Sequence, residues 1–261
     1  IATTLVSGLS VGSDVIIAQL WGAKRHRDAG EAARHFLGLS IAVSLMLATL
    51  GMTLNRFAMN LLGAESGVIE LAIPYSTIIF LVIPFTVLLQ VLSSILQGTG
   101  DTRTPMYAMI LVNLLHIGIA YPLVYGYWGL PALGVKGAAI AVGIAEAIGV
   151  VFLWWRSRPV LHSSTHIRLD LIRTMWHVGA PVSGERIVQQ AGILIYTKLV
   201  LLYGTVSYAA HQVGLSIESL SFLPGYGFAI AAATMVGQSI GAGKYTRAKL
   251  ENWEANRLAI I

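Results

Sequence analysis

The sequence predicts an all-α membrane protein, a polytopic helix bundle built from two similar lobes. Hydrophobic residues make up 56% of the 261 residues and charged residues only 11%, whereas a soluble domain is about 25% charged. Long apolar stretches recur along the chain, each sufficient to cross a bilayer core of about 30 Å. One short phrase also occurs twice. Most apolar stretches lack the polar face that a soluble helical bundle requires, which argues against that class.

The duplicated phrase reads AQLWGAKRHRDA over residues 18–29 and GQSIGAGKYTRA over residues 237–248. In each copy an apolar run precedes the phrase and basic residues follow it, as at a helix that leaves the membrane. Four positions are identical at an offset of 219 residues: Gln19, Gly22, Ala23 and Ala29 match Gln238, Gly241, Ala242 and Ala248. Two similar bundles facing each other are common in transporters. We interpret Gly22 and Gly241 as helix ends where glycine permits the turn, not as a binding site.

We expect seven substantial helices and the start of an eighth, over residues 1–21, 34–54, 70–97, 105–126, 134–156, 174–203 and 207–241, with the last beginning near residue 249. The loop charges support this order. One set of loops holds thirteen basic residues: Lys24, Arg25, Arg27, Arg34, Arg103, Arg156, Arg158, Arg168, Arg173, Lys244, Arg247, Lys249 and Arg257. The alternate set holds only Arg56 and Lys136. The positive-inside rule therefore makes the first set cytoplasmic, and the net charge of +5 does not indicate a nucleic-acid partner.

The longest polar stretch divides the chain into two lobes. Pro159 is expected to stop the fifth helix, and an amphipathic piece, HIRLDLIRTMW, follows a Ser- and Thr-containing segment. We therefore predict part of an amino-terminal lobe over residues 1–156, a cytoplasmic linker over residues 157–173 and the start of a carboxy-terminal lobe over residues 174–261.

Polar residues inside the first five helices are candidates for a site, because a charged side chain near the bilayer centre costs about 2.5–3.5 kcal/mol. Asp14 lies on the first helix, where snorkelling or a loop partner is the alternative explanation. Gln90 belongs to a stripe on the third helix. Asn113 and His116 lie one turn apart on the fourth helix, and packing is the commoner role of such a histidine.

A further acidic residue interrupts a seam of small residues on the fifth helix. The seam consists of Gly137, Ala141, Ala145 and Gly149, which predicts close helix packing. Glu146 follows Ala145 in this seam, and the pattern leaves both a structural and a functional role open. The stripe on the third helix consists of Thr86, Gln90, Ser93 and Gln97.

The two helices after the linker carry the remaining candidates. Glu185 and Gln189 share a helix face, which indicates a cation or proton site. The alternative is that Glu185 pairs with Arg186 or with a basic loop residue and anchors the helix. Glu218 lies deep in an apolar run, before an expected helix break at Pro224-Gly225. Such a break is tolerated only against protein or a water-filled cavity, so a cavity-lining role is favoured over an interhelical hydrogen bond.

The motifs of zinc proteases and of phosphate-binding loops are missing from the sequence. It contains no HExxH or GxxxxGK[ST] pattern, and its glycines fall in helices and at helix ends. The sequence therefore does not predict an enzyme, and it suggests no metal site or cofactor.

Several motifs, in order, resemble the MATE (multidrug and toxic compound extrusion) family. They are AQLWGAKR (18–25), ILQGTGDTRTPM (95–106), GVKGAAIAVGIAE (134–146), GAPVSGER (179–186) and MVGQSIGAGKYTRA (235–248). The resemblance implies twelve helices in two six-helix lobes, of which this chain would hold the second to the eighth and the start of the ninth. The chain starts with Ile1 inside an apolar run and ends as another begins, so we expect it to be part of a longer protein.

The resemblance also implies a function. Members of the family export organic, often cationic, compounds in exchange for Na⁺ or H⁺ by alternating access, so the expected partners are an organic small molecule, a coupling cation and the bilayer. The family further implies a monomer in the cell membrane, most often the bacterial inner or plasma membrane. The alternatives are a lipid or polysaccharide flippase of the same superfamily and, from another class, an enzymatic or structural membrane subunit.

One departure from the family pattern bears on the coupling site. Several branches carry a coupling carboxylate on the seventh helix, eight residues after a proline. Pro181 is that proline here, and the position holds Gln189. Glu185, one turn earlier on the same face, is the candidate replacement. Asp14 lies on the second helix, so it does not match the coupling aspartate that some branches carry on the first.

Overall fold

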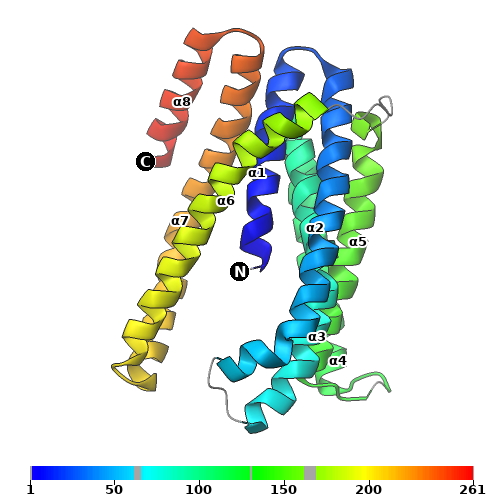
Figure 1. The fold of residues 1–261 in the computed structure, drawn as a ribbon, viewed down its shortest axis with the longest axis vertical. Coiled ribbons are helices and arrows are strands. Elements are labelled where there is room, and N and C mark those ends of the chain that lie inside the picture. The colour runs from blue at the N-terminus through cyan, green and yellow to red at the C-terminus, as the bar shows by residue number, and fades with distance from the viewer. Residues whose placement is uncertain (1, 62–65, 130, 162–168, 261) are drawn as a thin grey trace.

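The computed structural model describes residues 2–61, 66–129, 131–161 and 169–260, and these residues form eight α-helices (Figure 1). In chain order the helices are α1 (Ala2–Gly22), α2 (His26–Leu61), α3 (Ser66–Gly98), α4 (Arg103–Tyr125), α5 (Val135–Leu161), α6 (Leu169–Leu201), α7 (Thr205–Gly241) and α8 (Tyr245–Ile260). The predicted all-α class is confirmed, and each expected helix has its counterpart.

Five of the described helices are long and apolar enough to cross a membrane, which makes the protein a multi-pass one. The segments are His26–Phe57, Ala72–Gly98, Arg103–Tyr125, Val135–Leu161 and Val206–Gly241. Helix α6 is not among them, although it has 33 residues. Its sequence is interrupted by Glu185, Arg186 and Lys198, which lower its mean hydropathy.

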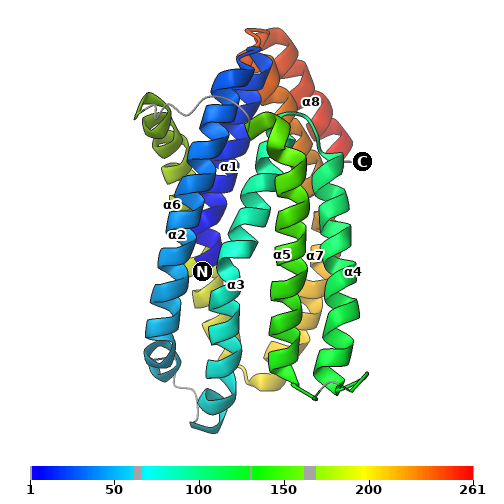
Figure 2. The same cartoon turned by 90° about the vertical axis from the view of Figure 1, so that its right-hand side faces the viewer.

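The loops alternate between the two ends of the bundle, as the charge distribution predicts. The turns α1–α2, α3–α4 and α7–α8 lie at one end, while the α4–α5 and α6–α7 connections lie at the other (Figures 1 and 2). We call the first end the basic end, because its turns and the adjoining helix starts carry Lys24, Arg25, Arg103 and Lys244.

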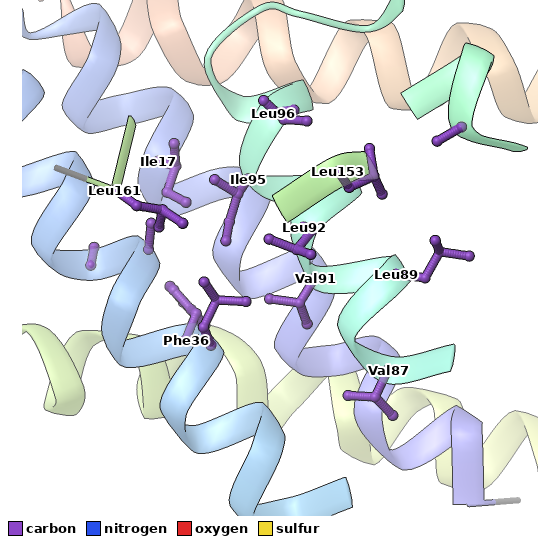
Figure 3. Packing of buried hydrophobic residues seen from close by; sticks show 14 of the residues in the cluster. Ile17, Phe36, Val87, Leu89, Val91, Leu92, Ile95, Leu96, Leu153 and Leu161 are labelled. Atoms are coloured by element: carbon purple, nitrogen blue, oxygen red, sulfur yellow. The ribbon is translucent and has the colours of Figure 1, made fainter. Parts of the chain in front are cut away.

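The core of the bundle forms around α3. Val87, Leu92 and Ile95 on α3 are fully buried between Ile17 of α1 and Leu153 of α5 (Figure 3). Phe36 from α2 closes the cluster. Apolar side chains on one strip of each helix therefore hold α1 to α5 together.

The small residues of α5 allow the helix to approach its neighbours closely. Gly137, Ala141, Ala145 and Gly149 are all buried. A Cβ atom at Gly137 would lie 2.6 Å from the carbonyl oxygen of Leu123 on α4. The predicted packing seam is confirmed, since such short approaches exclude a larger side chain.

Two predicted helix interruptions are wrong. Helix α7 is continuous from Thr205 to Gly241 and passes through Pro224, so no break occurs at Pro224-Gly225. Helix α5 likewise continues through Pro159 to Leu161. A proline removes one backbone hydrogen bond, but a long helix retains the others on both sides, and membrane helices tolerate this loss.

The predicted linker is partly helical. Its first residues, 157–161, complete α5, and its last residues, 169–173, belong to α6. Residues 162–168 lie outside the described part of the chain. The division of the chain into two lobes at this linker stays a prediction.

Candidate functional site

Helix α1 joins the two predicted lobes. It packs against α2 and α3 on one side and against α6 and α7 on the other. Away from the basic end, α6 and α7 diverge from α2 (Figure 1). A glycine makes the contact with α6 possible, since a Cβ atom at Gly8 would lie only 2.9 Å from the backbone oxygen of Gly179.

The duplicated phrase forms a reciprocal contact between α1 and α7. A Cβ atom at Gly22 would overlap the backbone oxygen of Gln238, and one at Gly241 would overlap the backbone oxygen of Gln19. The side-chain amide of Gln238 also donates a hydrogen bond of 3.0 Å to the carbonyl oxygen of Gly98. The two copies of the phrase therefore pack against each other and hold α1 to α7 at the basic end.

This contact corrects the interpretation of the two glycines. Gly22 and Gly241 do end their helices, as expected. The left-handed turn residues, however, are Lys24 (φ 59°) and Gly243 (φ 71°). The absence of a side chain at Gly22 and Gly241 is therefore required by the approach of another helix and not by the turn itself.

A cavity of about 790 Å³ lies where helices of both predicted lobes meet. Its volume is in the range of small-molecule sites. The polar and aromatic side chains among its lining residues are Ser10, Asp14, Thr86, Gln90, Ser93, Ser94, Gln97, Thr102, Glu146, Arg186, Gln189, Gln190 and Tyr226. The whole predicted stripe of α3 thus faces this cavity.

Three ionisable side chains line the cavity. Glu146 on α5 accepts a hydrogen bond of 2.6 Å from the hydroxyl of Thr86. Asp14 is buried and accepts a hydrogen bond of 3.4 Å from the hydroxyl of Thr234 on α7. Neither carboxylate makes an ion pair with another described residue.

Arg186 supplies the only basic side chain among the described lining residues. One of its terminal nitrogens donates a hydrogen bond of 3.2 Å to the side-chain oxygen of Gln189. Its Nε atom is buried and has no hydrogen-bond partner in the described part of the chain. Two carboxylates against one guanidinium leave the wall with one more acidic group than basic groups.

The predicted site residues fall into two groups. Asp14, Gln90 and Gln189 line the cavity, whereas the other four are not among its described lining residues. Those four are Asn113, His116, Glu185 and Glu218, of which only His116 is not exposed. The amide of Asn113 is engaged with its own helix, because it donates to the carbonyl oxygen of Met109 at 2.8 Å.

Glu185 lies at the edge of the face that α6 turns to the cavity. The cavity receives Arg186, Gln189 and Gln190, which are spaced by three and four residues and so share one face. Around the helix axis Glu185 is about 40° from Gln189 but about 100° from Arg186, and it is not among the described lining residues. It makes no ion pair with Arg186, and pairing with a basic loop residue, the other form of the anchoring alternative, stays a prediction.

No site role was predicted for Thr234, and Gln238 was identified only as part of the repeat. Thr234 lies in the run AIAAATMVG, where it is the only hydroxyl-bearing residue, and this isolation was a usable signal. Gln238 matches Gln19 in the duplicated phrase. Its contact with Gly98 depends on how the lobes meet, and no spacing in the sequence encodes that.

These features define a multi-pass helical membrane protein with a polar cavity where two groups of helices meet. The model of the MatE family matches residues 1–122 and 181–252, and the chain belongs to this family. Its members are transporters and not enzymes.

Curated relatives are matched over most of this chain. The chain is 31% identical to the probable multidrug resistance protein NorM of Thermotoga maritima, over 90% of this chain and 52% of that protein. It is 28% identical to the probable multidrug resistance protein YoeA of Bacillus subtilis, over 93% of this chain and 54% of that protein. The chain therefore spans about half the length of these relatives.

Solved structures show the same fold. A multidrug resistance MATE family transporter of the MOP superfamily, in an outward-facing conformation, matches 98% of this chain and 58% of its own, with a TM-score of 0.88 and 22% identity. A MOP superfamily transporter from Pyrococcus furiosus, described as having a binding pocket of reverse polarity, matches equally well, at 23% identity and a TM-score of 0.88.

Proposed function

We propose that the complete protein is a secondary active antiporter that exports organic, predominantly cationic, compounds in exchange for Na⁺ or H⁺. The observation that carries this proposal is the polar cavity between the lobes, whose wall holds Asp14 and Glu146 without an ion-pair partner among the described residues. The names of the relatives, which point to multidrug resistance, support the same function.

The contact between α1 and α7 at the basic end supports a mechanism of alternating access. The reciprocal glycine contact of Gly22 and Gly241 holds α1 against α7 at the basic end. The positive-inside rule directs that end to the cytoplasm. We therefore propose that this conformation is closed toward the cytoplasm, and that transport requires the contact to separate. The membrane is proposed to be the bacterial inner or plasma membrane, and the protein to act as a monomer.

The wall suits an organic cation of variable shape. Glu146 and Asp14 supply negative charge, and the ring of Tyr226 offers a face for a cation–π contact. Met106 and Met109 add flexible, polarizable surface that adapts to different ligands. Gln90 and Gln189 are proposed to bind substrate through neutral hydrogen bonds. Roles for Asn113, His116, Glu185 and Glu218 in ion coupling stay predictions.

Exchange by the complete protein in proteoliposomes tests the proposed class. An imposed gradient of Na⁺ or H⁺ is expected to drive ethidium transport against its own gradient. The Na⁺ gradient and the H⁺ gradient are imposed separately, because the cavity carboxylates Asp14 and Glu146 do not indicate which of the two ions is coupled. Ethidium transport that ignores both gradients would rule out a coupled antiporter, and failure to move ethidium at all would argue for another class of substrate.

Replacement of Glu146 by glutamine is expected to reduce ethidium exchange by about tenfold or more, because a hydrogen bond or contact to a charged group contributes about 1.5–3 kcal/mol. The side chain keeps its size, so packing on α5 is preserved. Initial rates at several ethidium concentrations measure the effect. Thr86→Val is the matched control: it removes the hydroxyl that bonds Glu146 and leaves the charge, and we expect a smaller loss.

A flippase for an anionic lipid or polysaccharide is the second candidate, and the unpartnered Nε atom of Arg186 favours it. The same assay separates the two functions. For a cation exporter, Arg186→Gln leaves ethidium exchange within about threefold of the parent, since no substrate cation contacts a guanidinium. For a flippase, Arg186→Gln abolishes transport of the anionic substrate, and Glu146→Gln has little effect.

A further inference from the structure

A second, smaller cavity lies at the basic end, between α4, α5 and the turn that precedes α4. Its volume is about 340 Å³, and it shares no described residue with the large cavity. Two arginines, Arg103 and Arg156, belong to its wall together with one carboxylate, Asp101. We call it the arginine cavity. Neither the proposed transport cycle nor the duplicated phrase uses any of its residues.

The arginine cavity lies at the boundary between apolar helix and polar turn. Arg103 is the first residue of α4, and Arg156 lies in the last turns of α5, two helices apolar enough to cross a membrane. Tyr107 and Trp155 form part of the wall and are 56% and 60% exposed. Exposed tyrosine and tryptophan at such a position are typical of the membrane interface.

The carboxylate of Asp101 is already engaged within the turn. One of its oxygens accepts a hydrogen bond of 3.0 Å from the backbone amide of Thr104, and the other accepts one of 2.6 Å from the Thr104 hydroxyl. Partial burial raises the pKa of Asp101, but the bonds from Thr104 and the nearby charge of Arg156 outweigh burial and lower it. Asp101 is therefore ionised at neutral pH, and the cavity carries two positive charges against one negative.

The two guanidinium groups retain free donors. Arg156 donates one hydrogen bond, of 3.4 Å, to the hydroxyl oxygen of Thr104. The guanidinium of Arg103 makes no hydrogen bond or ion pair with the described part of the chain. An arginine fork matches the geometry of a phosphate group, which accepts two parallel N–H bonds.

We infer that the arginine cavity binds the phosphate head group of an anionic phospholipid. Basic pockets between membrane helices on the cytoplasmic side are suited to such head groups. A lipid is favoured over free phosphate because apolar surface continues from the cavity along the helices. Ile110 and Leu114 on α4 and Val151 on α5 are exposed and provide a surface for acyl chains.

Lipid retention by the complete protein tests this inference. The protein, purified in detergent, is titrated with phosphatidylglycerol, phosphatidylcholine or inorganic phosphate, and binding is followed by native mass spectrometry. We expect phosphatidylglycerol to bind more tightly than phosphatidylcholine, and Arg103→Gln and Arg156→Gln each to weaken it by about fivefold. Lys249→Gln is the charge-matched control, because Lys249 is exposed at the basic end and lies outside the cavity.

Several results would overturn the inference. Equal weakening by Lys249→Gln would show that only the overall basic charge attracts the lipid. Displacement of phosphatidylglycerol by millimolar inorganic phosphate would identify a site for free phosphate instead. Equal affinity for both lipids would remove the role of the head-group charge. If Arg156→Gln fails to fold, Arg103→Gln alone still tests the inference, because the Arg103 side chain makes no hydrogen bond or ion pair within the described structure.

Discussion

Replacing Gly22 by alanine is expected to abolish most transport by preventing the basic end from closing. The added Cβ atom would overlap the backbone oxygen of Gln238, which cannot swing away as a flexible side chain could. Relief requires α1 and α7 to separate. Overpacking of this kind costs about 1–3 kcal/mol, enough to shift a two-state equilibrium between closed and open by roughly 5- to 150-fold.

Labelling of a cysteine in the cavity measures this opening. The 261 residues contain no cysteine, so Ser94→Cys introduces a single reporter within them on the cavity wall. In inside-out vesicles of the complete protein, a membrane-impermeant maleimide is expected to label Ser94→Cys faster when Gly22→Ala is also present. Because the contact is reciprocal, Gly241→Ala should give the same increase in labelling and the same loss of ethidium exchange.

Gly38→Ala on α2 is the matched control for the Cβ atom that Gly22→Ala adds between α1 and α7. A Cβ atom at Gly38 would meet nothing within 4 Å, and alanine favours a helix over glycine. We expect neither faster labelling nor slower exchange for this variant. If Gly22→Ala transports ethidium and labels like Gly38→Ala, the glycine contact does not control access to the cavity.

Replacing Asp14 by asparagine is expected to reduce gradient-driven exchange by more than about tenfold, because a buried charge in the membrane requires a cation or a proton as partner. Asparagine keeps the size of the side chain and an oxygen that accepts the bond from Thr234. The contact between α1 and α7 is therefore preserved while the charge is lost. Ethidium exchange under imposed Na⁺ and H⁺ gradients measures the loss.

Thr234→Val separates a role in cation binding from a role in closing the lobes. This variant removes the donor of the 3.4 Å hydrogen bond and leaves the Asp14 charge in place. If Asp14 binds the coupling cation or the substrate, Thr234→Val should retain most exchange. Equal losses in Asp14→Asn and Thr234→Val would show that Asp14 acts only by holding α1 against α7.

The helices were predictable because membrane crossing leaves a strong local signal. The expected third helix, 70–97, lies within α3, and the expected seventh, 207–241, coincides with α7 apart from its first residues. The predicted helix interruptions at Pro159 and Pro224 were wrong, because both helices continue through the proline. The effect of a proline depends on the hydrogen bonds of neighbouring turns, which hold the helix together on both sides.

The site was predictable only in part. The polar stripe of α3 and Asp14 were found because polar residues stand out in apolar helices, and they do line the cavity. The choice of Glu185 over Arg186 on α6 depended on which face of that helix meets α1, and helical periodicity alone leaves that rotation open. Glu146 was left without an assignment for the same reason.

The duplicated phrase shows most directly which properties the sequence determines and which depend on the tertiary structure. The sequence by itself determined that two equivalent helices end at the same side of the membrane, because apolar length and basic flanks are local properties. Only the tertiary structure decided that Gly22 and Gly241 serve the approach of α1 to α7. That role depends on the distance between residues more than two hundred positions apart. The same holds for Asp14 and Thr234, whose hydrogen bond arises where the two helices meet.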